Sequence, residues 1–371
     1  MFNGFLLVAG ALLVLDAPAL LQAQAPYPQS RVVTGLAWAP EIVRVGGINT
    51  HTGDNWPATW GDDDILYTSW GDGDGFSHKK PELSLGFAKV TGNPAGELKA
   101  EVIPSNVDTV MGGGTKGIKS SALLMVDGTI YMFVRNYKVG DDVTNSRLAW
   151  SKDRQKTWTW ADWHFSDTFG CLEFAQFGRN YAGARDNYVY IVSQDNDNAY
   201  KYAEKVVMAR VPKDRIADRG AYEFFAGRDA TGPPRWSRDM GARQPILTDP
   251  KGAQRVSLTY NAALKRYFLV TSIGTHGSAT KAMHTGGLGV FDAPEPWGPW
   301  TTVYYDQYWS GGHNLEYKLE EWTYHQKFPT KYISSDGKEM WLLFSGRGEN
   351  YTFCLRKATL EVARSSTNQR R

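Results

Sequence analysis

Apolar and polar positions alternate in short runs along most of the chain, and turns rich in Gly, Asp and Asn separate these runs. The clearest unit contains two such runs, Trp56–Trp60 and Ile65–Trp70, joined by the acidic turn Gly61–Asp64. Aromatic and β-branched residues bounded by Gly and Asp are typical of a β-hairpin. Only Lys213–Gly220 suggests a short helix. The pattern therefore predicts a protein built almost entirely of strands.

The same hairpin design returns along the chain. In three copies an Asp lies four residues before a Tyr, and two looser copies follow, so that the anchors are Tyr67, Tyr131, Tyr190, Tyr267 and Trp341. The anchors recur every 59 to 77 residues, with three or four predicted strands in each repeat. A repeat of this kind predicts an all-β, five-bladed β-propeller with a central substrate pocket, a single domain over residues 26–371. Arg31–Thr34 is expected to form a strand that closes the ring.

The first 25 residues have the features of a signal peptide. Phe5–Leu15 is an apolar core, and Ala23-Gln-Ala25 provides a small-x-small cleavage site before Pro26. Asp16 interrupts the apolar tract and no Lys or Arg precedes it, so a retained anchor is the alternative. We expect a cleaved signal and a secreted or periplasmic protein. No other segment is a candidate membrane span.

Composition narrows the classes of partner. The 371 residues carry 41 basic and 39 acidic side chains without a Lys/Arg-rich run, which argues against nucleic acid and a membrane surface. The 14 Trp and 38 Gly suit a sheet-rich protein that stacks sugars. We expect a monomer that acts on a polysaccharide or oligosaccharide. Cys171 and Cys354 fall in different repeats, which favours two buried free thiols and leaves their pairing open.

Two motifs connect the chain to known propellers. Ser151-Lys-Asp-Arg-Gln-Lys-Thr-Trp158 resembles the Asp-box of sialidase-type propellers, with Gln155 where Gly is usual. Asp292–Trp300 resembles the Gly-Pro-Trp blade edge of arabinanase- and xylosidase-type glycosidases.

Further stretches, together with these motifs, resemble a family of secreted bacterial five-bladed propellers, the domain-of-unknown-function family 4185. They are Asp54–Pro57, Gly71–Phe76, Leu124–Gly128, Asn180–Asp186, Ala221–Phe225 and Phe328–Lys331. The resemblance covers nearly the whole mature chain and implies the fold. Some relatives look like endo-acting D-arabinanases, which implies a carbohydrate-active enzyme.

The start of the innermost strand of each blade should face the pocket, as it does in glycosidase-type propellers. The repeat register places these positions at Asp54, Lys119, Glu173, Arg255 and Lys327, with His325 just before the last. Glycoside hydrolysis requires a carboxylate and a carboxylic acid across one pocket. The similarity to arabinanase-type propellers implies Asp54 as base and Glu173 as acid, although that group has an Asp in blade two where this chain has Lys119. Turn capping by Asp54 and an ion pair at Glu173 form the structural alternative.

The cations favour a second enzyme class. Lys119, Arg255 and Lys327 around one cavity would suit an acidic sugar, and a polysaccharide lyase would use them to neutralise a uronate. His51 and His325 are then the candidate bases, and Tyr260 and Tyr324 the candidate acids. A non-catalytic glycan-binding propeller is the third alternative.

The remaining predicted substrate contacts are polar and aromatic side chains. Asn136 and Arg243 are the polar candidates, and the aromatic candidates for stacking on sugars are Trp56, Trp236, Trp309 and Trp322. The turns Asp72–Gly75 and Asp195–Asp197 offer oxygen ligands, so calcium is an option, but we expect no required cofactor. No zinc, phosphate-loop or dinucleotide motif is present. The sugar, its linkage, endo or exo action, and inversion or retention stay open.

Overall fold

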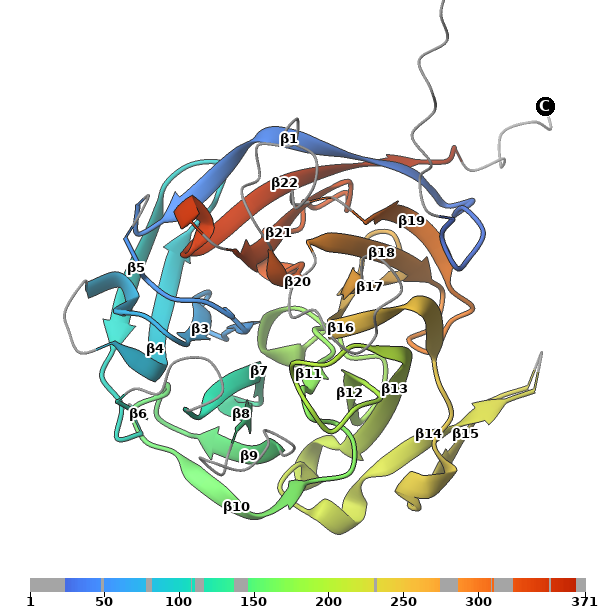
Figure 1. The fold of residues 1–371 in the computed structure, drawn as a ribbon, viewed down its shortest axis with the longest axis horizontal. Helices are drawn as coiled ribbons and strands as arrows, with labels where there is room; N and C mark the ends of the chain where they lie inside the picture. Colours follow the sequence, from blue (N-terminus) through green and yellow to red (C-terminus); the bar gives the residue numbers. More distant parts are fainter. Residues whose placement is uncertain are drawn as a thin grey trace, which may run out of the picture.

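The computed structural model describes residues 24–47, 50–77, 82–107, 109–110, 117–136, 146–229, 232–273, 286–307, 309, 323–346 and 348–364. Within these ranges the chain forms five antiparallel blades around a central axis (Figure 1). The predicted five-bladed β-propeller is therefore confirmed. The described segments contain no α-helix, and their helical turns are the short 3-10 elements η1 Gly75–Ser77, η3 Arg179–Tyr181, η4 Lys213–Arg215, η5 Arg219–Ala221, η6 Met240–Ala242, η7 Thr330–Tyr332 and η8 Gly348–Asn350. Elements η4 and η5 occupy the segment predicted as a short helix.

Blades I and II are consecutive four-stranded meanders. Blade I consists of β2 Ala58–Trp60, β3 Leu66–Trp70, β4 Leu83–Gly92 and β5 Leu98–Ile103, with β6 Thr109–Val110 added to β4. Blade II consists of β7 Lys119–Val126, β8 Thr129–Arg135, β9 Ser146–Ser151 and β10 Thr159–Phe165. The predicted hairpin around Gly61–Asp64 is the β2–β3 hairpin, in which Thr59 pairs with Tyr67.

Blades III and IV share backbone pairing. Blade III consists of β11 Glu173–Phe174, β12 Tyr188–Gln194, β13 Ala203–Pro212 and β14 Glu223–Arg228, extended by β15 Pro234–Ser237. Blade IV consists of β16 Leu247–Asn261, β17 Arg266–Ile273, β18 Gly287–Ala293 and β19 Thr301–Asp306. The first part of β16 pairs with β13, and its second part forms the inner strand of blade IV.

Blade V is assembled from both ends of the chain. Its inner strands are β20 Tyr324–Lys327, β21 Glu339–Ser345 and β22 Phe353–Val362, and its outermost strand is β1 Val33–Val45. Strand β1 runs antiparallel to β22, with Val33 opposite Val362 and Val45 opposite Phe353. The predicted closing strand thus begins at Val33 and is longer than expected.

Apolar side chains fill the spaces between blades, because each blade has a neighbour on both faces. Every residue of β7 is buried, and Trp158 stacks on Phe87 of the neighbouring blade with ring centroids 5.1 Å apart. Cys171 and Cys354 are both free and buried, as the sequence favoured. Across the described residues, no helix has the length and apolar character needed to cross a membrane.

Candidate functional site

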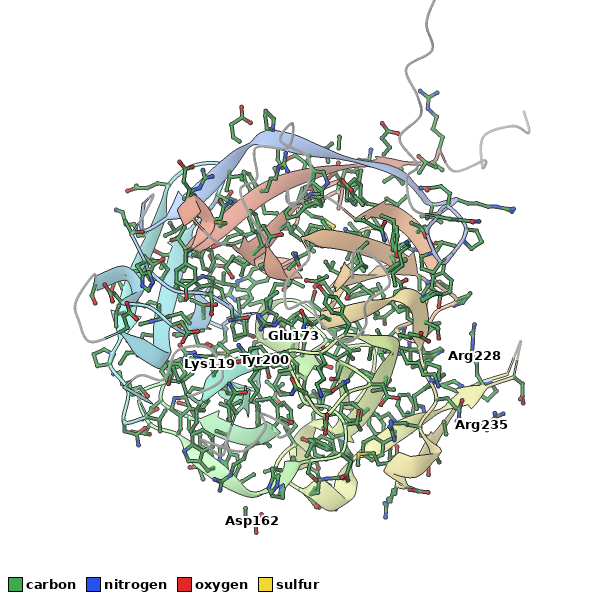
Figure 2. All side chains as sticks on the ribbon, viewed as in Figure 1. Lys119, Asp162, Glu173, Tyr200, Arg228 and Arg235 are labelled. Carbon is green, nitrogen blue, oxygen red and sulfur yellow. The ribbon has the colours of Figure 1, made fainter. Side chains whose placement is uncertain are left out.

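The inner strands deliver the predicted pocket residues to the centre of the ring. Lys119 opens β7 and Glu173 opens β11, and Figure 2 shows both near the middle of the molecule. Asp54 forms a backbone bridge to Gly71 just before β2, Arg255 lies within β16, and Lys327 ends β20. All five side chains are buried, each residue being at most 7% exposed. The repeat register therefore located a buried cluster of charges, which we call the central cluster.

Glu173 is the focus of one half of this cluster. Lys327 Nζ donates a hydrogen bond to Glu173 Oε2, and His325 Nε2 lies 3.5 Å from the same oxygen. Burial raises the pKa of Glu173 to about 7, although Lys327 opposes the change. Burial also lowers the pKa of Lys327, and it lowers that of His325 well below the usual range, with further contributions from Lys327 and Arg255. His325 is therefore neutral at neutral pH.

Asp54 is the focus of the other half. It accepts a hydrogen bond from Asn55 Nδ2, and Asn55 Oδ1 in turn accepts one from Arg255 Nη1. Burial and the nearby Asp72 raise the pKa of Asp54, while Arg255 and Lys119 oppose the change. Because Arg255 also acts electrostatically on His325, it connects the two halves. The central cluster thus contains two buried carboxyl groups whose protonated forms are both favoured by burial.

Sequence reasoning did not single out three members of this site. Arg135 ends β8 directly opposite Lys119, is fully buried, and acts electrostatically on Asp54, His325 and Lys327. Tyr200 is partly exposed, and its hydroxyl accepts a hydrogen bond of 2.9 Å from Asn136 Nδ2. Asp72, considered only as a calcium ligand, is paired with Lys119. The cross-strand position opposite Lys119 was the available signal for Arg135.

Left-handed backbone conformations accompany the site. Asn55, Asp72, Asn136, Arg255 and His325 all have φ between 48° and 60° although none is Gly. Positive φ is uncommon for non-Gly residues, although Asn, Asp and His adopt it more readily than others, so Arg255 is the most unusual of the five. Arg255 is held in place by its backbone amide, which donates to Gln194 Oε1 at 2.9 Å. The backbone is therefore shaped to aim side chains inward from several blades.

Three predicted site residues have other surroundings. His51 is 55% exposed at its side chain, contacts Glu82 through Nδ1 at 3.1 Å, and lies against the ring of Tyr351. Trp56 is 1% exposed and packs on Trp70, Phe76 and Phe353, so its ring lies in the hydrophobic core. Arg243 holds Asp195 Oδ1 at 2.9 Å through both Nε and Nη2.

The other aromatic candidates contact aromatic neighbours where they are described. Trp236 contacts Phe225 and Trp297, and Trp309 is 2% exposed between Trp38 and Phe344. Tyr260 stacks with Tyr267. Trp322 and the side chain of Tyr324 lie outside the described residues. Trp309 is therefore a core residue, whereas Trp236 and Tyr260 are half-buried.

In each turn considered for calcium, the first carboxylate forms an ion pair. Asp72 pairs with Lys119, and Asp195 pairs with Arg243 and accepts a hydrogen bond from Thr168. His51, Asp74 and Glu82 offer ligand atoms within 4.8 Å of one another.

Asp153, in the Asp-box-like turn, accepts hydrogen bonds from the backbone and side chain of Thr157. A hollow of about 260 Å³ lies at the opposite end of β7 from Lys119, lined by Asp127, Asn180, Asp186 and their neighbours.

Sequence comparison places the chain in a family. The family described as "Domain of unknown function (DUF4185)" matches residues 48–332, and the chain belongs to this family. A search of the curated proteins gave no match.

Several solved structures are similar to this chain at low sequence identity. A presumed hydrolase from Bacteroides ovatus is 10% identical with a TM-score of 0.52, and the alignment covers 87% of this chain and 93% of that one. A GH43_1 enzyme from Xanthomonas citri, solved with xylotriose, is 12% identical with a TM-score of 0.49 over 88% and 91% of the chains. An exo-β-1,3-galactanase from Phanerochaete chrysosporium, solved with β-1,3-galactotriose, is 11% identical with a TM-score of 0.47 over 87% and 67%.

Proposed function

We propose that this protein is a glycoside hydrolase that cleaves a polysaccharide or oligosaccharide, with Glu173 as general acid and Asp54 as general base. The observation that carries the proposal is the position of Glu173, which is buried at the start of the inner strand β11 with Oε1 unpaired among the described residues, and burial raises the pKa of its carboxyl group to about 7. A general acid must keep its proton at the working pH until the glycosidic oxygen leaves. Glu173 meets this requirement at neutral pH, and its position at the start of an inner strand directs it toward the axis.

The two oxygens of Glu173 have different tasks in this mechanism. Oε2 accepts from Lys327 and lies near His325, whereas Oε1 is buried and has no hydrogen-bond partner among the described residues. Oε1 is therefore the atom that would carry the proton to the leaving oxygen. Lys327 holds the carboxyl group in place.

Asp54 supplies the complementary negative charge. Arg255, Lys119 and Arg135 each favour its ionised form, against the effects of burial and Asp72. An ionised Asp54 would activate water or attack the anomeric carbon, according to whether the reaction inverts or retains configuration. Asn55 fixes the orientation of the carboxylate through its side-chain amide.

A lyase is the second candidate, and the state of His325 is the observation that favours it. The ring is buried and kept neutral, and Nδ1 has no hydrogen-bond partner within the described part of the chain. A neutral imidazole can remove a proton beside a uronate that Arg255 neutralises. The non-catalytic glycan-binding propeller is the third candidate.

The deciding experiment is a screen of the purified mature protein against neutral and uronate-containing polysaccharides. Reducing ends and the ultraviolet absorbance of a new C=C bond are measured in parallel. Reducing ends without absorbance, lost in Glu173→Gln, support the hydrolase. If both signals rise together on an acidic glycan, the result supports the lyase and contradicts the hydrolase. Binding without either signal would leave the glycan-binding propeller.

We also propose a location, an oligomeric state and a cofactor requirement for the enzyme. The apolar segment Phe5–Leu15 and the site Ala23–Ala25 support export, so we propose a secreted or periplasmic protein. We further propose a monomer that requires no cofactor. Removal of a leader during export, read as the N-terminal residue of the mature protein by mass spectrometry, tests the first point, and sedimentation tests the second.

A further inference from the structure

Arg135 differs from the other cations of the central cluster in its partners. Lys119 is paired with Asp72, Lys327 with Glu173, and Arg255 donates to Asn55, which in turn donates to Asp54. The fully buried Arg135 donates a hydrogen bond from Nη1 to the Ser120 carbonyl oxygen at 2.7 Å, and Tyr200 is a further hydrogen-bond partner of its guanidinium group. Its Nε and Nη2 have no hydrogen-bond partner among the described residues.

These two nitrogens form one edge of the guanidinium group. Nε–H and Nη2–H point in parallel from that edge, and the geometry matches the two oxygens of a carboxylate. The third nitrogen, Nη1, is the one already used for the backbone of Ser120. The side chain is therefore anchored by one nitrogen while its carboxylate-binding edge is left without a protein partner in the described structure.

The protein uses the same edge to hold carboxylates elsewhere. Arg210 contacts Glu223 Oε2 through Nε and Nη2, each at 2.8 Å. Arg243 contacts Asp195 Oδ1 through Nε and Nη2, each at 2.9 Å. Arg135 presents this edge inside the central cluster, where the described side chains supply no carboxylate to it.

Burial makes this arrangement costly without a ligand. Burial alone would lower the pKa of Arg135, but Tyr200, Cys171 and Asp54 outweigh it and the pKa is raised, so the group stays charged. A buried charge with open donors costs several kcal/mol unless it is compensated. With Arg135 and Asp72 added, the described charged groups of the central cluster are four cations and three carboxyl groups, and the pKa of Asp54 and that of Glu173 are both raised. These described groups therefore carry a surplus of positive charge.

We infer that Arg135 forms an anion subsite that binds the carboxylate of a uronic acid residue, so that the substrate is an acidic glycan. The inference rests on the proposed function in placing a glycan in the central pocket. Tyr200 completes the subsite, since its ring lies 5.9 Å from Arg135 Cζ and 5.5 Å from Arg255 Cζ (Figure 2). The hydrogen bond from Asn136 fixes the Tyr200 hydroxyl between them. A sugar ring next to this aromatic side chain would place its carboxylate on the open edge of Arg135.

The test compares each acidic probe with its own neutral form. Oligosaccharides of galacturonate, glucuronate and alginate are titrated calorimetrically into the full mature protein at pH 7, beside samples whose carboxyl groups have been reduced to alcohols. We expect at least one uronate to bind and its reduced form to bind about 10- to 100-fold more weakly, the range for a charge-assisted hydrogen-bonded pair. Equal affinity for every acidic and reduced pair, or binding of none, would overturn the inference.

Variants assign the discrimination to Arg135. Arg135→Gln should lose the preference for the acidic form, and Arg135→Lys should keep only part of it because an ammonium group cannot form the two-pronged contact. Arg235→Gln, an exposed Arg at the outer edge of the ring in Figure 2, should behave as wild type. A merely structural Arg135 would instead weaken both forms equally. Circular dichroism and the thermal midpoint confirm that each variant is folded.

Reducing-end assays on the same samples separate this inference from the proposed function. Cleavage of a neutral glycan, with no preference for binding acidic glycans, would support the hydrolase proposal and contradict the anion subsite. Preferential binding of a uronate without cleavage would keep the subsite and remove the hydrolase.

Discussion

The Nε2 atom of His325 lies 3.5 Å from the Oε2 atom of Glu173, although the two side chains come from blades V and III. A charged imidazolium at this distance would stabilise the ionised carboxylate. Burial and the neighbouring cations instead hold the pKa of His325 well below its usual range, so the ring is neutral. Burial raises the pKa of Glu173 to about 7, so its carboxyl group keeps its proton up to about that pH. The following predictions address the acid–base chemistry of Glu173 and its neighbours.

Replacing the proposed acid should affect natural substrates most. Glu173→Gln should lower kcat on the glycan identified in the screen by about 10²- to 10⁴-fold, the usual contribution of a general acid. An aryl glycoside of the same sugar, whose leaving group needs no proton, should be much less affected. Parallel kinetics on the two substrates measure the difference. The exposed Glu339→Gln is the control, and equal losses on both substrates would argue against an acid role.

Replacing the proposed base should reduce turnover without weakening the fold. Burial and Asp72 raise the pKa of Asp54, so its ionised form destabilises the native state, and Asp54→Asn should leave the thermal midpoint unchanged or higher. We expect kcat to fall at least 100-fold on the glycan and on the aryl glycoside alike. Calorimetry and initial rates test both statements, with the outward-facing Asp162→Asn as control (Figure 2). An active or strongly destabilised variant would contradict them.

The fall of activity on the alkaline side of the pH profile should reflect the ionisation of the Glu173 carboxyl group. Its carboxyl group has a pKa of about 7 in the folded protein, so kcat/KM should fall as the pH rises through this value. Lys327 lowers that pKa, and Lys327→Met should therefore move the limb to higher pH. The surface variant Lys357→Met should leave it in place. A limb that stays fixed or moves to lower pH in Lys327→Met would assign it to another group.

The same titration affects stability. Because the folded-state pKa of Glu173 is raised above its usual value of 4.5, the unfavourable contribution of its ionisation grows as the pH rises from about 4.5 to about 7. In Glu173→Gln this part of the pH dependence of the free energy of unfolding should disappear. Denaturant titrations at several pH values measure it.

Replacing Trp56 should lower the stability of the fold and leave substrate affinity unchanged. Its ring is 1% exposed and stacks on Phe76, so Trp56→Ala should lower the free energy of unfolding by about 3–5 kcal/mol, and Trp56→Phe by less. The KM of folded Trp56→Phe should match that of the wild type. Denaturant titration and steady-state kinetics make the distinction. A stable variant with a raised KM would instead indicate that Trp56 contacts the substrate.

Chelation should leave activity unchanged. The carboxylates of Asp72 and Asp195, which the sequence offered to calcium, are paired with Lys119 and Arg243. We therefore expect equal rates and thermal midpoints in EDTA and in millimolar calcium. A loss of rate in EDTA that calcium restores would show that a metal is required.

The repeat pattern predicted the fold and much of the central cluster for one physical reason. Each blade starts its inner strand at the axis, so the spacing of the Asp–Tyr turns fixes where Lys119 and Glu173 lie. Arg135 was missed because it ends a second strand, and only its pairing opposite Lys119 brings it to the centre. Tyr200 was missed because it follows β12 in a segment without a strand pattern.

Proximity in sequence misled the reasoning around Asp54. His51 and Trp56 are close to it along the chain, but His51 and Asn55 both have left-handed φ values, of 48° and 53°. Each such residue turns the backbone, so neighbouring side chains leave in different directions. His51 faces Glu82 near the surface and Trp56 enters the hydrophobic core. An alternating pattern cannot reveal a turn that single residues impose.

The pairing of β1 with β22 constrains the order in which the molecule can form. Val33 and Val362 are partners in one blade, so the last blade stays incomplete until the end of the polypeptide has been synthesised. A chain that leaves the ribosome or crosses a membrane from its N-terminus would carry an unpaired β1 throughout. Completion of the ring is thus a late event. If the chain is exported, it would stay incompletely folded, and so able to pass through a translocation channel, until its last strand has been synthesised.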